Sequence, residues 1–302
     1  MSIQIARRGA VAARRHGIQP YPGWWYSTLQ GIPLGDMGTD RWSGTSTANA
    51  LNQQWNYWDN PGGSAVSAAA EGIPAQPSGD DTLIKWYKAA GGTNEYQKLT
   101  DFITSANWPN PRGYPPPTGT APPDVSGRYI THLYIPSNRF TLNPSHGWVN
   151  FFEMKEDYQD ASNVWHQDPA WQVMCMNYVT PGTNTICIWG GTHNYPTVTT
   201  NNYLFAPFMD RWLTWEQRVY QGSLDTSGHG GRVEWWSNGQ LMDTIYESEQ
   251  HIGPPVFAPD LAHTNSWLYV AGQYSSNQGT DYMGTDVTTY VGSSYMLPLS
   301  TV

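Results

Sequence analysis

Acidic and basic residues alternate in the segment 148–157, WVNFFEMKED, and such side chains can do chemistry on sugars. Glu153, Lys155 and Asp157 fall on one face of an extended strand, because successive side chains point to opposite faces. Two carboxylates serve a retaining glycoside hydrolase when they lie about 5 Å apart. The Cα atoms of residues 153 and 157 are about 13 Å apart on a strand, so the spacing favours a solvated, ion-paired strand end.

Histidines are scattered along the chain, and one of them is a candidate for a groove. His132 and Tyr134 alternate on the predicted strand 127–136 and therefore share one of its faces. A lone histidine is more often a hydrogen-bonded part of the scaffold than a base or a ligand. The sequence has no HExxH motif and no Ser-His-Asp grouping. A place in a ligand-binding groove and a structural role are therefore both open for His132 and Tyr134.

The acidic segment 281–286, DYMGTD, is a candidate for holding a structural calcium ion. It lacks the full ligand pattern of an EF-hand loop, and a plain acidic turn fits it as well. We expect no catalytic metal and no cofactor.

Two cysteines, Cys175 and Cys187, flank the turn sequence VTPGTN. If the segments 171–178 and 185–189 form a hairpin, the two residues lie nearly opposite one another and a cross-strand disulfide becomes an option. Two buried free thiols are the alternative, and they suit a chain made in a cytoplasm. CxxC spacing is missing, so we expect no structural zinc site.

Aromatic residues occur near Gly and Asn in two runs, one with Trp24, Trp25 and Tyr26 and one with Trp55, Tyr57 and Trp58. Exposed Trp and Tyr can stack on sugar rings, while Asn, Gln and Asp bond sugar hydroxyls. The alternative is that most of the 16 Trp fill the core, where aromatic side chains bury the largest area.

Composition places the chain among all-β proteins. Aromatic residues make up 14% and charged residues 13%, and 30 Gly and 23 Pro interrupt the sequence often. The formal net charge of −9 argues against a nucleic-acid partner. No apolar stretch approaches the about 18 residues of a membrane span.

The first 20 residues form a basic, Ala-rich arm with arginines at positions 7, 8, 14 and 15. The arm is either a frayed terminus or a segment that docks on an acidic neighbour. No apolar core follows the arginines, so we expect no signal peptide and synthesis in a cytoplasm.

Strands are predicted along the remaining chain, with little helix and no internal repeat. The segments 80–92 and 94–105 read as two strands joined by a Gly-Gly turn, and the run 162–171 around His166 reads as a loop. A Pro-rich stretch, 108–123, resembles a linker, but the strand pattern continues beyond it. We therefore expect one jelly-roll β-sandwich domain over residues 21–302.

The segment 211–245 carries the most specific strand pattern. Two alternating strands are separated by a Gly-rich turn, and Asn238-Gly239 marks a tight turn into a third strand. Its pattern, "W…E.RV…G.VE.W.NG", resembles the back-sheet hairpin of concanavalin A-like jelly rolls, particularly the polysaccharide lyase and laminin-G-like branches. The resemblance extends over most of residues 21–302, through the segments LIKWYK, YQKLTDF, RYITHLYIP, WVNFFEMKED, RVEWWSNGQ and LYVAGQY in family order.

The resemblance implies a set of site residues. Lyases of this class present an Arg and Glu, then a Gln and His, and finally a Tyr that transfers the proton, while the cationic and polar groups stabilise the uronate. Here Gln97 and Lys98 stand where Arg and Glu are expected, and Glu153 and Lys155 stand where Gln and His are expected. Tyr274 occupies the position of the late Tyr. A carboxylate at position 153 repels a uronate unless Lys155 shares its groove.

Three functions compete on this reading. The first is a non-catalytic carbohydrate-recognition protein on a virion, since the chain resembles bacteriophage minor tail proteins. The second is a structural virion component, and the third is a polysaccharide lyase with Tyr274, Lys155 and Glu153 as catalytic residues. For the virion roles we expect a host glycan and other virion proteins as partners, the latter through residues 1–20, within an oligomer or assembly. The candidate glycan contacts are Gln97, His132, Tyr134, Glu153, Lys155 and Tyr274.

Overall fold

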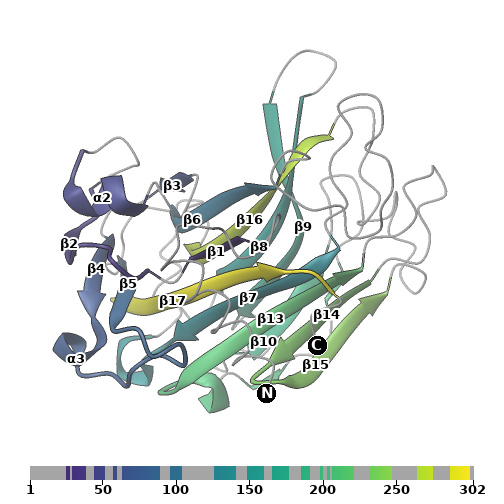
Figure 1. Ribbon diagram of the computed structural model, residues 1–302. Coiled ribbons are helices and arrows are strands. Elements are labelled where there is room, and N and C mark those ends of the chain that lie inside the picture. Colours follow the sequence, from purple (N-terminus) through teal and green to yellow (C-terminus); the bar gives the residue numbers. More distant parts are fainter. Residues whose placement is uncertain are drawn as a thin grey trace.

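Alternating apolar and polar residues make most of this chain extended, and the computed structural model arranges the strands in two antiparallel sheets (Figure 1). The structure describes residues 25–27, 29–38, 44–51, 57–59, 63–88, 96–103, 126–140, 148–159, 165–176, 185–190, 198–199, 203–204, 206–220, 232–246, 264–274 and 286–299. In the smaller sheet it describes side chains for residues 149–152 and the backbone elsewhere. The fold is all-β, a jelly-roll sandwich of two antiparallel sheets, and this prediction of the fold class is confirmed.

The larger sheet has nine strands. Along its main path these are β15 (Gln240–Tyr246), β14 (Arg232–Ser237), β13 (Trp212–Tyr220), β7 (Gly127–Tyr134), β17 (Val287–Leu297), β5 (Thr82–Lys88), β4 (Gly63–Ser67) and β2 (Gly35–Asp36), and β1 (Trp25–Ser27) pairs with β17.

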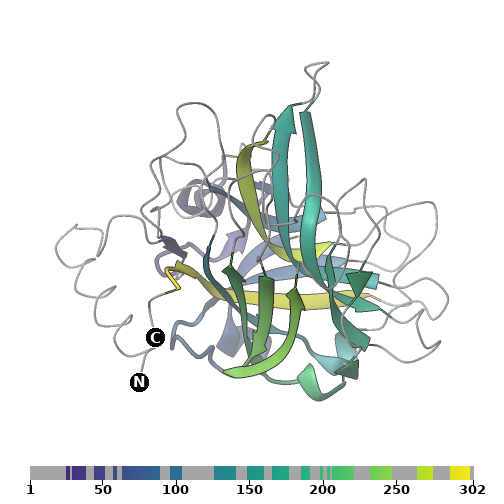
Figure 2. The same cartoon turned by 90° about the vertical axis from the view of Figure 1, so that its right-hand side faces the viewer.

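The smaller sheet has eight strands. Its main path runs through β11 (Val198–Thr199), β10 (Thr185–Gly190), β9 (Trp165–Met176), β8 (Trp148–Gln159), β16 (Thr264–Tyr274), β6 (Tyr96–Ile103) and β3 (Tyr57–Asp59), and β12 (Tyr203–Leu204) pairs with β10. The long teal strands β8 and β9 extend beyond the green strands of the nine-stranded sheet (Figure 2).

Helical residues are few in the described part of the chain. They form α2 (Ser46–Leu51), α3 (Ala68–Glu71) and the 3-10 turns η1 (Ser137–Arg139) and η2 (Ala206–Phe208). None of the described helices has the length and apolar character that a membrane crossing needs.

Aromatic side chains join the two sheets. Trp215 on β13 is 2% exposed, and its ring lies 5.6 Å from that of Phe151 and 5.1 Å from that of Phe152, both on β8 of the other sheet. Trp235 on β14 packs edge-on against Trp215 at 5.8 Å. Trp86 is also fully buried. For these three Trp the core role, rather than sugar stacking, therefore holds.

A covering segment, residues 67–81, lies over the other face of the nine-stranded sheet. Trp212 Nε1 donates to the Pro74 carbonyl at 2.6 Å, and Gln76 Oε1 accepts from the backbone N–H of Ser293 at 2.8 Å. Gln76 is 2% exposed. The sheet therefore has a second apolar layer on this side, which consists of Val66, Ala68, Ile73, Leu83, Tyr134, Trp212 and Tyr290.

Glu71 fixes the covering segment through charge. Lys85 Nζ lies 2.9 Å from its Oε2, and the Tyr290 hydroxyl donates to the same oxygen at 2.7 Å. Burial alone raises the pKa of Glu71, but the hydrogen bonds from Lys85 and Tyr290 outweigh burial and hold the pKa below its usual value.

A charged row occupies the same outer side of β7, β13 and β14. Glu216 accepts from Arg128 Nε at 2.6 Å and from Arg218 Nε at 2.5 Å, and the Arg218 guanidinium stacks on Trp236 at 3.8 Å. Burial raises the pKa of Glu216, but the two arginines outweigh burial and lower the pKa. The charged side chains of this row pair with one another, which indicates a structural role.

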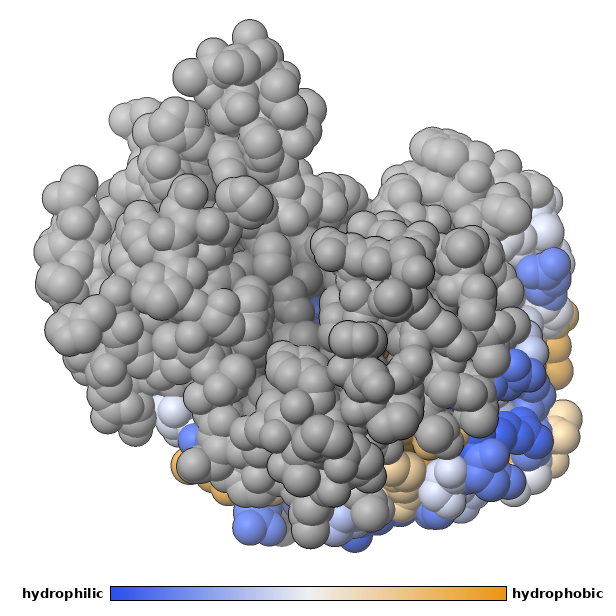
Figure 3. Space-filling view, turned by 180° about the vertical axis from the view of Figure 1, so that it is seen from behind, coloured by the Kyte–Doolittle hydropathy of each residue, from blue (hydrophilic) through white to orange (hydrophobic). Residues whose placement is uncertain are grey.

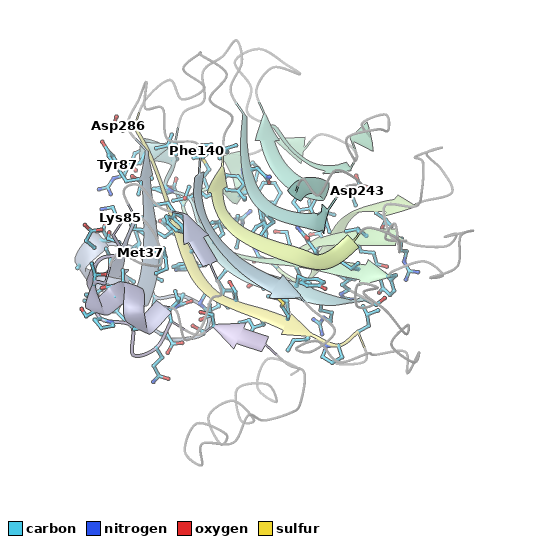
Figure 4. The ribbon with its side chains drawn as sticks, turned by 90° about the horizontal axis from the view of Figure 1, so that it is seen from above. Met37, Lys85, Tyr87, Phe140, Asp243 and Asp286 are labelled. Carbon is cyan, nitrogen blue, oxygen red and sulfur yellow. The ribbon has the colours of Figure 1, made fainter. Side chains whose placement is uncertain are left out.

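Charged, polar and apolar residues are interspersed on the described surface. Seen from behind, the described residues are both hydrophilic and hydrophobic (Figure 3). The large apolar residues exposed in the described part are Leu34, Tyr87 and Leu241, on three different elements or loops. Seen from above, Tyr87 lies beside Asp286, to which its hydroxyl donates at 2.7 Å (Figure 4).

The tight turn predicted at Asn238-Gly239 is confirmed. The two residues have φ of 49° and 81°, the left-handed values that Asn and Gly tolerate. Asn238 Oδ1 accepts from the Thr214 N–H at 2.8 Å, and the Asn238 N–H donates to the Thr214 carbonyl at 2.9 Å. The segment 211–245 thus forms β13, β14 and β15, side by side in the nine-stranded sheet.

Two sequence interpretations need correction. The segments 80–92 and 94–105 contain strands β5 and β6, but β5 belongs to the nine-stranded sheet and β6 to the eight-stranded sheet. Strand alternation alone does not reveal which sheet a strand joins. The run around His166 is not a loop, because β9 begins at Trp165 and continues through it.

The predicted hairpin of β9 and β10 is confirmed, and its register separates the cysteines. Cys187 pairs with Met174, and Cys175 pairs with Ile186. Residues one position apart along a strand belong to opposite faces. Cys175 and Cys187 therefore occupy positions on opposite faces of the sheet, which does not fit a cross-strand disulfide.

The basic arm 1–20, the Pro-rich stretch 108–123 and residues 281–285 lie outside the described residues. Their expected roles stay predictions.

Candidate functional site

The outer face of the eight-stranded sheet, meaning the face turned away from the nine-stranded sheet, contains the candidate site. Val149 and Phe151 on β8 are 0% and 1% exposed, and Phe151 packs on Trp215 across the core. Asn150 lies between these two core residues, so alternation places it on the outer face. The strand register agrees with this placement. Asn150 pairs with Met174 on β9, whereas the core residue Phe152 pairs with the adjacent Val173.

Two irregularities in the sheet meet at Asn150. The pairing of β8 with β9 shifts between Asn150 and Phe152, and the pairing of β8 with β16 shifts between Ala271 and Tyr274. After the second shift Tyr274 lies opposite Asn150. Bulges often occur next to sites, where they change the direction of a side chain. Here they bring an amide residue and a tyrosine into one register pair on the outer face.

The Asn150 amide is buried and has no hydrogen-bond partner among the residues that the structure describes. The residue is 2% exposed, and neither its Nδ2 nor its Oδ1 has a partner among the described residues. A buried polar group left unpaired costs about 1–3 kcal/mol. Such a group in a native protein calls for a functional or structural explanation. An amide offers two donors and an acceptor, which matches a sugar hydroxyl.

Two more of the sequence candidates share this face by register. Glu153 pairs with Val270 and Gln172, and Lys155 pairs with Leu268. Positions 153 and 155 follow the core residue Phe152 at odd steps, so both belong to the outer face. Alternation therefore places Glu153 and Lys155 on the same side of the sheet as Asn150 and Tyr274.

Gln97 falls at a different register position. It pairs with Gln273, and its neighbours Tyr96 and Lys98 pair with Tyr274 and Gly272. Since paired residues share a face, Tyr96 and Lys98 belong to the outer face and Gln97 to the core side. On β6 the outer-face position next to the site is thus that of Lys98.

His132 and Tyr134 are not brought together with the other candidates. They lie on β7 in the nine-stranded sheet, on the side that the covering segment 67–81 protects, and are 4% and 7% exposed. Tyr134 packs against Tyr290 and Trp212 at 6.2 and 5.5 Å. Both residues are packed in the scaffold of the other sheet, away from Asn150 and Tyr274, and a glycan contact by them stays a prediction.

Tyr134 is also unsuited to proton transfer. Burial raises the pKa of its hydroxyl, and the negative charge of Asp210 raises it further. A base has to lose its proton readily near neutral pH, and this tyrosine holds its proton more tightly than usual.

Asn150 is the residue that sequence reasoning missed. It stands inside the apolar run Trp148–Phe152, WVNFF, where a single polar residue interrupts a strand that otherwise reads as core. That interruption was the available signal. Its meaning depends on the bulge at Phe151, which alternation of residue types does not reveal.

The described residues offer no group of three or more His, Cys, Asp or Glu that could hold a metal ion. Of the acidic segment 281–286, only Asp286 is described, and its carboxylate accepts from Tyr87. A calcium ion at that segment stays a prediction.

Comparison with known proteins gives likeness of fold. No family model matches the chain, and no curated protein matches it. Among solved structures, an alginate lyase, vAL-1 from a Chlorella virus, is 11% identical with a TM-score of 0.47, covering 88% of this chain and 99% of its own. The laminarinase catalytic domain of Thermotoga petrophila is 10% identical with a TM-score of 0.42, covering 91% and 98%.

A third similar structure is the CBM2 module of the evolved Dit of Lactobacillus casei phage J-1. It is 8% identical with a TM-score of 0.38, and the match covers 78% of this chain and 87% of that one. At this level of identity the three likenesses concern the sandwich alone.

Proposed function

We propose that this protein is a non-catalytic carbohydrate-recognition protein of a virion surface, of the phage minor tail protein type, and that its outer face contacts a host cell-surface glycan. The observation that carries the proposal is the buried Asn150 amide, which has no partner among the described residues and lies opposite Tyr274. An amide that can donate and accept, next to an aromatic residue, suits a sugar ring with its hydroxyls.

The charged residues at the outer-face positions favour binding over catalysis. Removal of the proton next to a uronate carboxylate needs a cation or several donors to stabilise the developing charge. On the described strands, the outer-face positions hold no Arg and no His, and their cations are Lys98 and Lys155. In this proposal Tyr274, Glu153 and Lys155 contact the glycan, and Gln97 supports the strand from the core side.

The virion role rests on the sequence. The basic arm of residues 1–20 docks on other virion proteins, and the sandwich projects its outer face toward the host. In this role the protein works within an assembly, which adds avidity to weak single sites.

A glycan array with the purified full chain tests the proposal. Binding of wild-type protein to a defined set of glycans, and loss of that binding in Tyr274→Ala, is the expected result. Tyr220→Ala, on the nine-stranded sheet, is the matched control and should bind like wild type. Absence of binding to every glycan on the array would leave a structural virion component as the better description.

The alternative function is a polysaccharide lyase that cleaves uronate glycans by β-elimination. The position of Tyr274 beside a buried amide favours it, since a tyrosine can transfer the proton while an amide donates to the carboxylate. Incubation with alginate and polygalacturonate, followed by ultraviolet absorbance of the unsaturated product, decides between the two. Absorbance that grows with wild type and stays flat with Tyr274→Phe would establish the lyase.

A further inference from the structure

We infer that the outer face selects uncharged glycans and rejects uronate polymers; this inference rests on the proposed function and names its ligand class. Three features carry it, namely the balance of charge on the outer face, the neutrality of the buried group at its centre, and the charge of the whole chain.

Acidic positions outnumber basic positions on the outer face of the described strands. Register places three acidic and two basic residues there, namely Asp59, Glu153, Asp157, Lys98 and Lys155. A groove that binds a polyanion has the opposite balance, with a cation for each carboxylate or nearly so.

Both lysine positions have acidic neighbours. Lys98 on β6 pairs directly with Asp59 on β3. Lys155 lies two residues from Glu153 and two from Asp157 along β8, so all three share a face. A uronate carboxylate that approached either lysine position would compete with a carboxylate of the protein itself.

The residue at the centre of the site is neutral. The Asn150 amide is 2% exposed, so a ligand group that reaches it leaves water behind. A hydroxyl loses little, because the amide replaces the hydrogen bonds that water supplied. A carboxylate loses the hydration of a full charge, and the neutral amide does not compensate for that loss, which costs several times more than the burial of a hydroxyl.

The whole chain adds a longer-range effect in the same direction. Its formal net charge is −9, so at low ionic strength a polyanion is repelled before it reaches the face. Association with an uncharged glycan does not feel this field, and its affinity should change little with salt.

Titration calorimetry with the full chain tests the inference. The probes are tetrasaccharides of glucan, mannan, galactan, alginate and polygalacturonate, each measured at about 50 and about 500 mM NaCl. We expect at least one neutral tetrasaccharide to bind at least about tenfold more tightly than either uronate, with a Kd that changes less than about twofold between the two salt concentrations.

A charge variant sharpens the test. In Asp59→Asn, uronate binding should become detectable or strengthen several-fold, while neutral binding stays within about twofold, because a repulsive charge has been removed at constant size from a position that the proposal does not assign to glycan contact. Asp286→Asn removes the same charge from an exposed residue immediately before β17 of the nine-stranded sheet and is the matched control, with neither effect.

Two results would overturn the inference. Tighter binding of a uronate, with a Kd that weakens as salt rises, would show a cationic site and leave the proposed glycan recognition intact. No binding of any tetrasaccharide, together with a silent glycan array, would remove the proposed function and the inference with it.

Discussion

Asn150 is the described residue at which the demands of folding and of binding differ most clearly. Its side chain is 2% exposed, it stands in an apolar strand, and neither amide atom has a partner among the described residues. Evolution of stability alone would favour an apolar residue of the same size at such a place. Residues that lower stability in this way are expected where a ligand makes the missing hydrogen bonds.

The first prediction concerns the stability of Asn150→Leu. Leucine has a similar volume and no polar atoms, so the variant should unfold at the same or higher denaturant concentration, by up to about 1–2 kcal/mol in the free energy of unfolding. Urea denaturation of the ligand-free protein measures this difference. A loss of more than about 2 kcal/mol would mean that the amide makes bonds essential to the fold.

At the scale of elements, the covering segment 67–81 explains why His132 and Tyr134 are scaffold. Gln76 holds it, because its Nε2 donates to the Thr82 carbonyl at 3.1 Å and its Oε1 accepts from the Ser293 N–H at 2.8 Å. A side chain that pairs two buried backbone groups acts as a clasp between a loop and a sheet.

The second prediction is the effect of Gln76→Ala. The change leaves the Ser293 N–H and the Thr82 carbonyl without this partner, and we expect a loss of about 2–3 kcal/mol in the free energy of unfolding. Gln240→Ala, at an exposed Gln on β15, is the matched control and should stay within about 0.5 kcal/mol of wild type. Equal stability of the two variants would show that the covering segment is held without Gln76.

The third prediction concerns acid. The folded pKa of Glu216 lies below its unfolded value, so its stabilising effect is complete above the unfolded pKa and is lost as pH falls through the folded pKa. Glu216→Gln leaves two arginines with a neutral partner and should cost about 3 kcal/mol at pH about 7.

The measurement for Glu216 is denaturation of wild type and variant at neutral pH and at pH about 3. The difference between them should shrink in acid, because the wild-type carboxylate is then increasingly protonated. A difference that keeps its size in acid would mean that the charge of Glu216 does not stabilise the fold.

At the scale of the whole molecule, the sequence predicted most strands and the jelly-roll class, because alternation and turn residues are local signals. The turn at Asn238-Gly239 and the strand β17 are examples. Sheet membership was harder to predict, as β5 and β6 show, because it depends on contacts far apart in the sequence. The site was predicted in part, since Tyr274 was identified through resemblance and Asn150 required the register of two bulges.

The fourth prediction belongs to the assembly. Deletion of residues 1–20 should abolish incorporation into the virion and leave the sandwich folded, because the described strands begin beyond the arm. Cooperative thermal melting of the truncated protein, together with its absence from purified particles, is the expected result. Loss of cooperative melting would show instead that the arm is part of the folding unit.

The central claim is that the outer face binds a glycan through Asn150. Its most direct test is calorimetric titration of wild type and Asn150→Leu with the tightest glycan found on the array. We predict at least about tenfold weaker binding by the variant at an unchanged or higher melting temperature, since one buried hydrogen-bonding group contributes about that much. Equal affinity of the two proteins would contradict the claim and place the glycan site elsewhere.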